Sequence, residues 1–234
     1  MSDRFLEDSF KAVGGRFPIP VKALRNKLDD CRAMVFDWDG VFNDGRKGGG
    51  TASGFSEADS MGTNMLRYGL WHRHGKLPYT AIITGEDNRG AIEFAEREHF
   101  SAIYSRVRRK QEVVAHLCEH NGLEPGQVAC VFDDINDLAM AGTCGLRLLV
   151  RRDSSPLFVQ FVERGNFCDY VSGANAGGHA VREICELLLG AMNLYGKVVM
   201  SRLDSDDSYA RYFAARQAAT TIAYMQDENG IRKS

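Results

Sequence analysis

Short apolar runs alternate along this chain with stretches of helical periodicity. The apolar runs lie at 33–36, 79–85, 102–105, 127–132, 146–150 and 169–171. Continuous apolar runs of this length are typical of strands that are buried on both faces of a sheet. The intervening stretches predict helices at 61–75, 87–100, 110–122, 155–164 and 177–196. This alternation predicts an α/β fold of Rossmann-like type, a three-layer arrangement with helices on both faces of a parallel sheet.

Two flanking segments extend this predicted core, which we place at 31–195. Residues 1–30 are interpreted as an N-terminal leader with short helices, and residues 196–234 as a C-terminal helical extension with a helix at 205–227. Residues 43–60 are rich in glycine, serine and aspartate, and they predict a loop or a weak hairpin inserted into the core.

Polar residues follow three of the predicted strands. They are Asp37 and Asp39, then Thr84 and Gly85, then Asp133 and Asp134. In parallel sheets, ligands bind outside the carboxyl ends of the strands. We therefore expect these residues to converge on one edge of the sheet and to form the functional site.

Paired aspartates at a strand end suit phosphoryl transfer. The Asp37 carboxylate is the candidate nucleophile, because its attack on phosphorus would divide one difficult step into two easier ones. Asp39 lies two residues further on and could protonate the leaving group. Such a carboxylate cluster needs a cation, and Mg²⁺ prefers hard oxygen ligands. Asp37, the main-chain carbonyl of Asp39, and Asp133 are the candidate metal ligands.

Three further residues are candidates for binding the phosphate group. Thr84 and the main chain at Gly85 could donate hydrogen bonds to it, and Lys110 could neutralise its charge. Each motif taken alone also has an ordinary structural interpretation, as a turn, a helix cap, a loop or a solvated basic run. The order of the motifs, each after its own predicted strand, favours a phosphotransfer site.

Composition adds limits on location and partners. The chain has 234 residues, 44% hydrophobic residues and a formal net charge of −2, which gives no bulk argument for nucleic acid or an anionic membrane surface. We see neither a signal-peptide pattern at the start nor an apolar run long enough for a membrane span. The six cysteines are scattered. We therefore expect buried, reduced thiols in a cytoplasmic protein that binds neither nucleic acid nor membranes.

The ordered motifs resemble those of the haloacid dehalogenase superfamily. The matching segments are DWDGV at 37–41, ITG at 83–85, Lys110 and DDIND at 133–137. The chain is most similar to the 3-deoxy-D-manno-octulosonate 8-phosphate phosphatases, through D-x-D-G-V-x-x-D-G at 37–45 and AVREICELLL at 180–189. The resemblance covers about residues 30 to 190. It implies the catalytic, phosphate and metal roles given above, and it places Asp134 and Asp137 around them, with Asp137 orienting a metal-bound water or Lys110.

The same resemblance bears on assembly and substrate. Only the segment at 43–60 separates the first motif from the next predicted helix, which leaves no room for a cap domain, so the chain resembles the capless branch. In that branch a hairpin from a neighbouring subunit completes the site of a homotetramer. The family's usual arginines are replaced here by Glu86, Ala58 and Gly178, and Phe132 replaces a small residue beside the metal and is expected to crowd it.

The function expected from these observations is hydrolysis of a small phosphorylated sugar or sugar acid by a Mg²⁺-dependent phosphatase. The alternatives are a phosphatase for a different sugar phosphate, and a non-catalytic oligomerisation or scaffold domain of the same fold. A phosphomutase is disfavoured because its intermediate normally needs a cap to hold it.

Overall fold

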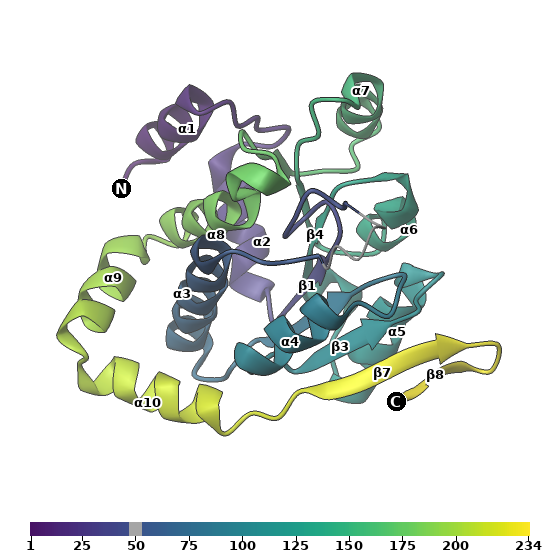
Figure 1. Ribbon diagram of the computed structural model, residues 1–234. Coiled ribbons are helices and arrows are strands. Elements are labelled where there is room, and N and C mark those ends of the chain that lie inside the picture. The colour runs from purple at the N-terminus through teal and green to yellow at the C-terminus, as the bar shows by residue number, and fades with distance from the viewer. Residues whose placement is uncertain (47–52) are drawn as a thin grey trace.

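The computed structural model describes residues 1–46 and 53–234 (Figure 1). Their strands are β1 (Ala33–Asp37), β2 (Tyr79–Ile83), β3 (Ala102–Ser105), β4 (Val128–Phe132), β5 (Leu146–Leu149), β6 (Tyr170–Val171), β7 (Ile222–Asp227) and β8 (Gly230–Lys233). Their α-helices are α1 (Asp3–Ala12), α2 (Val21–Asp30), α3 (Glu57–His74), α4 (Arg89–Arg97), α5 (Lys110–Asn121), α6 (Leu138–Ala141), α7 (Pro156–Arg164), α8 (Ala180–Ala191), α9 (Tyr195–Asp204) and α10 (Asp207–Gln217).

All of these strands belong to one sheet, in the order β6-β5-β4-β1-β2-β3-β7-β8. Neighbouring strands are parallel except for β8, which runs antiparallel to β7. The α/β fold with a central parallel sheet is therefore confirmed. Strand β1 lies between β2 and β4, and this order brings the ends of all three strands to the same edge of the sheet.

Successive side chains of the central strands pack on opposite faces of the sheet. Met34 and Phe36 of β1 belong to the apolar cluster under α2, α3, α4 and α8, whereas Val35 belongs to the cluster under α5, α6 and α7. Adjacent side chains of a strand point to opposite faces, so a strand that is covered on both sides needs apolar residues at every position. This is the physical reason for the continuous apolar runs in the sequence.

The N-terminal helices pack against the core. Leu6 of α1 and Leu24 and Leu28 of α2 are buried in the same apolar cluster as α8. Figure 1 shows α1 and α2 beside α8 on one side of the sheet. Residues 1–30 therefore cover the sheet with apolar side chains.

The C-terminal segment differs from the predicted helix at 205–227. Helix α10 ends at Gln217, and residues 222–233 form the β7–β8 hairpin, which adds to the edge of the sheet beside β3. Extended pairing with β3 allows Tyr224 to stack on Tyr104 with a centroid distance of 4.9 Å. The prediction of an entirely helical extension was wrong because it overlooked Asn229-Gly230, a hairpin signal in which Gly230 has φ +112°.

Two other predicted boundaries also change. The predicted helix at 177–196 ends at Ala191, and Asn193 follows with φ 57° before α9 begins. Asparagine tolerates this left-handed conformation better than most residues. The predicted insert at 43–60 falls partly on residues outside the described ranges. Its last residues are helical, because the Ser56 side chain accepts from the Asp59 N–H and caps α3.

All six cysteines are buried and free, as the sequence predicted. Within residues 1–46 and 53–234, no single helix is long and apolar enough to cross a membrane. Helices α8 and α9 reach the length and apolar composition of a membrane span only when they are taken together, and a bend of 106° separates them.

Candidate active site

The polar residues that follow β1, β2 and β4 meet at one cavity of about 240 Å³. The lining contains every site residue that the sequence predicted: Asp37, Asp39, Thr84, Gly85, Lys110, Asp133, Asp134 and Asp137. Glu86, Val107, Arg108 and Asn136 complete the described lining. The convergence expected at the carboxyl edge of the sheet is therefore present.

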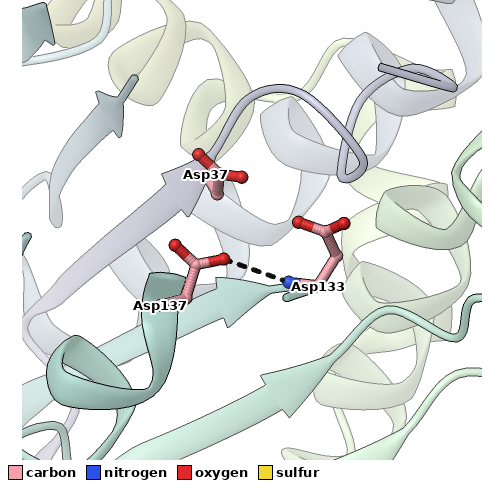
Figure 2. Close-up of side chains that lie close together, drawn as sticks. All are labelled: Asp37, Asp133 and Asp137. Carbon is pink, nitrogen blue, oxygen red and sulfur yellow. Dashed lines mark hydrogen bonds between the residues drawn. The ribbon is translucent and has the colours of Figure 1, made fainter. Parts of the chain in front are cut away.

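Three buried carboxylates form the centre of this cavity. One ligand oxygen from each of Asp37, Asp133 and Asp137 lies within 4.8 Å of the others. Figure 2 shows Asp37 at the tip of β1 and Asp133 just beyond β4, with Asp137 on the short turn that follows. Asp137 Oδ2 accepts from the Asp133 N–H at 3.4 Å. This bond closes the turn and holds two of the three carboxylates together.

Lys110, the first residue of α5, joins two of these carboxylates. Its Nζ donates to Asp37 Oδ1 at 2.5 Å and also to Asp137 Oδ1. The lysine is only 7% exposed. Burial lowers the pKa of the Lys110 ammonium, but the Asp37 and Asp137 carboxylates outweigh burial and raise this pKa above its ordinary value. Lys110 is therefore held as a cation.

The carboxylates carry more negative charge than Lys110 balances. Burial, together with the nearby Asp137, raises the pKa of Asp37 well above its ordinary value, although Lys110 opposes this rise. Burial also raises the pKa of Asp133 to about 6, against the opposing effect of Arg152. A divalent cation would favour the ionised forms of both groups. Hard carboxylate oxygens at this spacing are suitable ligands for such an ion.

Asp39 lies beside the carboxylate cluster and is held by other contacts. Its Oδ1 accepts from Ser53 Oγ at 2.8 Å and from Asn88 Nδ2 at 3.5 Å. The next residue, Gly40, has φ +92°, and a Cβ there would lie 2.1 Å from Asp133 Oδ2. A side chain at this position is therefore excluded, which explains the glycine after the two aspartates. The proposed metal contact of the Asp39 carbonyl stays a prediction.

Thr84 presents its side chain from the neighbouring strand end. It is 1% exposed, and its N–H donates to the Tyr104 carbonyl at 2.9 Å, which continues the β2–β3 ladder. The Glu86 N–H donates to Thr84 Oγ1 at 3.4 Å. These bonds fix the Thr84–Gly85 corner at the cavity wall. Phosphate binding by this corner and Lys110 stays a prediction.

One contact at the site was missed by the sequence interpretation. Arg152, two residues after Val150, donates to Asp133 Oδ2. It follows β5, which is the neighbour of β4 in the sheet. The rule that strand ends converge could have identified Arg152, because the polar segment after the predicted strand at 146–150 contains it.

The expectation that Phe132 crowds the metal is not met. Its side chain is fully buried in the apolar cluster under α5, α6 and α7, and it is not part of the cavity lining. Alternation along β4 turns Phe132 and Asp133 to opposite faces. Of the residues that replace the family's arginines, Glu86 lines the cavity, whereas Ala58 and Gly178 do not.

Comparison with known proteins agrees with this fold. The 3-deoxy-D-manno-octulosonate 8-phosphate phosphatase KdsC of Escherichia coli (strain B / BL21-DE3) is 29% identical over 175 residues, which cover 73% of this chain and 86% of that protein. A probable YrbI family phosphatase from Pseudomonas syringae pv. phaseolica has the same fold, with a TM-score of 0.64 and 26% identity, over 78% of this chain and 98% of that one.

A third relative supports the fold alone. The 3-deoxy-D-manno-octulosonate 8-phosphate phosphatase of Moraxella catarrhalis, whose crystal structure holds magnesium, phosphate and a KDO molecule, has a TM-score of 0.63 at 24% identity, over 76% of this chain and 97% of that one. No family model matches the chain.

The parallel sheet, the strand-end aspartates and these relatives together support a phosphatase of the haloacid dehalogenase superfamily. Within that superfamily the chain is similar to the KdsC and YrbI phosphatases.

Proposed function

We propose that this chain is a Mg²⁺-dependent phosphomonoesterase that acts on a small phosphorylated sugar or sugar acid. The observation that carries the proposal is the cluster of Asp37, Asp133 and Asp137, joined by Lys110 at the carboxyl edge of the sheet. The similarity to enzymes named for 3-deoxy-D-manno-octulosonate 8-phosphate supports a substrate of that class.

Mg²⁺ would be held by Asp37 and Asp133, with Asp137 in the same cluster. When bound, it would neutralise charge on the phosphoryl oxygens and favour the ionised form of Asp37. The Lys110 ammonium would be a second cation at the phosphate, and Thr84 and the main chain at Gly85 would donate hydrogen bonds to it.

The reaction divides into two displacements at phosphorus. In the first, a carboxylate oxygen of Asp37 attacks phosphorus, the bond to the ester oxygen breaks, and Asp39 gives its proton to the departing sugar oxygen. In the second, the Asp39 carboxylate takes a proton from water. The water oxygen attacks the same phosphorus, and the bond to Asp37 breaks to release inorganic phosphate.

Phosphate release from a panel of sugar phosphates tests this proposal. We expect release that needs Mg²⁺ and is abolished both by chelator and by Asp37→Asn. Glu93→Gln is the control, because Glu93 is an exposed carboxylate that pairs with Arg89 on α4 and does not line the cavity. Release that persists in Asp37→Asn, or no release from any panel member by the folded wild-type protein, would overturn the proposal.

We also propose that the working form is a cytoplasmic homotetramer. Apolar side chains on α9 and α10 support self-association, since Met200, Leu203 and Phe213 are 53%, 72% and 43% exposed. Light scattering should give the mass of four chains in solution. A monomer with full turnover would contradict the assembly but leave the proposed chemistry intact.

A further inference from the structure

The catalytic cavity shares one residue with a second cavity. This neighbour, of about 540 Å³, lies between the segment that precedes α5 and the turn of the β7–β8 hairpin. Its described lining is Arg106, Arg108, Arg109, Gln226, Asp227, Glu228 and Asn229. Arg108 lines both cavities. A molecule that occupied both cavities would therefore pass Arg108.

Arg108 differs from the neighbouring cations in its contacts. Arg106 pairs with Asp87, Arg109 pairs with Glu112 at 2.9 Å, and Lys110 pairs with Asp37 at 2.5 Å. Across residues 1–46 and 53–234, the structure gives the Arg108 guanidinium no carboxylate partner. An arginine presents a planar fork of donors that matches carboxylate and phosphate oxygens. This fork is available to a ligand at the junction of the two cavities.

The lining of the catalytic cavity is mostly acidic, which restricts where a second anionic group of a substrate could lie. Five aspartates and Glu86 line the catalytic cavity, and the only described cations there are Lys110 and Arg108. Lys110 is already shared by two carboxylates. A second anionic group on a substrate would be repelled by the acidic lining unless it lay near Arg108. Arg152 also lies at the site, but it pairs with Asp133. The charge pattern therefore favours a position near Arg108 for such a group.

The hairpin holds the backbone that carries Arg108. Gln226 Oε1 accepts from the N–H groups of Arg108 and Arg109, at 2.8 and 3.2 Å. Its Nε2 donates to Glu112 Oε2 at 2.6 Å. The Gln226 side chain of β7 thus bonds both the segment that precedes α5 and the first turn of α5. The C-terminal hairpin, which lies outside the predicted core, therefore anchors the main chain at Arg108.

We propose that the second cavity receives the leaving group of the substrate and that Arg108 binds a second anionic group on it, either a carboxylate or a further phosphate. Gln226 is the positioning residue for this contact. The inference rests on the proposed phosphatase function and deepens it, because it assigns the choice of substrate to Arg108 and the hairpin.

Steady-state kinetics on three matched esters test the assignment. The substrates are a neutral sugar phosphate, the corresponding phosphorylated sugar acid and the corresponding bisphosphate. For at least one anionic ester, we expect Arg108→Gln to lower kcat/KM by roughly ten- to a hundredfold, chiefly through KM, since a charge-assisted contact is lost. The neutral ester should change less than about twofold, and Arg108→Lys should restore part of the loss. The ester that responds identifies carboxylate or phosphate as the recognised group.

Two further variants separate the possible results. Arg89→Gln is the matched control, because Arg89 pairs with Glu93 on α4 and lines neither cavity. Gln226→Ala should raise KM for the same anionic ester with little change in kcat.

Equal losses on all three esters, or no loss in Arg108→Gln, would overturn the role of Arg108 while wild-type turnover upheld the phosphatase. An unchanged KM in Gln226→Ala would overturn the positioning role. Absence of wild-type turnover on every ester would overturn both proposals.

Discussion

Nζ of Lys110 donates to Oδ1 of Asp37 at 2.5 Å, so the first residue of α5 is bonded to the last residue of β1. The same ammonium donates to Asp137. This three-residue contact answers a question that the sequence raises, namely how a buried strand can end in a carboxylate. The negative charge of Asp37 is compensated by Lys110, which lies on α5, and a metal ion would complete the compensation.

Replacement of Lys110 should therefore destabilise the metal-free protein. Lys110→Met leaves the Asp37 and Asp137 carboxylates buried without their cation, and we expect the free energy of unfolding to fall by about 3 kcal/mol. Urea denaturation in the presence of chelator measures the change. Arg89→Met is the control, because its pair with Glu93 is exposed and should contribute less than about 1 kcal/mol. Equal stability of the two variants would contradict the compensating role of Lys110.

Arg152 should compete with the metal for Asp133. The guanidinium donates to Oδ2 of Asp133, and the Asp133 carboxylate belongs to the candidate metal cluster. We expect Arg152→Gln to bind Mg²⁺ about tenfold more tightly, because the competing cation is gone. Calorimetric titration of Mg²⁺ into the metal-free protein measures this directly. Arg151→Gln is the matched control, since Arg151 pairs with Asp153 instead. Weaker Mg²⁺ binding by Arg152→Gln would show that the arginine supports the site.

The sequence predicted the parts of this molecule that repeat a local pattern. The central strands were visible because a strand covered on both faces has no polar alternation, and the site was visible because Asp37, Thr84 and Asp133 each follow such a strand. The β7–β8 hairpin was missed because β7, although it pairs with both β3 and β8, is only partly covered by other side chains. Its burial is uneven and gives no continuous apolar run. Arg152 could have been suspected from its place after the predicted strand at 146–150, but its pairing with Asp133 depends on the adjacency of β4 and β5, which is a property of topology.

The pH dependence of stability follows from Asp133. Its pKa is raised from 3.8 to about 6 by burial, so between these values the folded chain binds a proton that the unfolded chain releases. Its contribution to stability therefore falls as pH rises through this window, and the full cost is present above about pH 6.

Asp133→Asn removes this titration. In chelator, its stability relative to the wild type should increase by roughly 2 to 3 kcal/mol between about pH 4 and about pH 7. Urea denaturation at several pH values gives the difference. A difference that does not vary with pH would contradict the raised pKa of Asp133.

Strand β7 should contribute measurably to folding through Tyr224. Its ring stacks on Tyr104 at an interplanar angle of 11° and is 9% exposed. We expect Tyr224→Ala to lower the free energy of unfolding by about 3 kcal/mol, because a packed aromatic ring is lost. Ile222→Ala, on the same strand but 37% exposed, should have a smaller effect. If the two variants lose equal stability, the stacking is not the main contribution of this strand.

The central claim is that Asp37 is the nucleophile, and the most direct measurement is to locate phosphate on it. Asp39→Asn is the variant to use, with an aryl phosphate as substrate. An aryl oxygen leaves without a proton from residue 39, whereas the attacking water still needs the missing base. The phosphorylated enzyme should therefore accumulate. Acid quench followed by peptide mapping should find phosphate on the peptide that contains Asp37. Phosphate on another residue, or turnover with no phosphorylated enzyme at any time, would contradict the account.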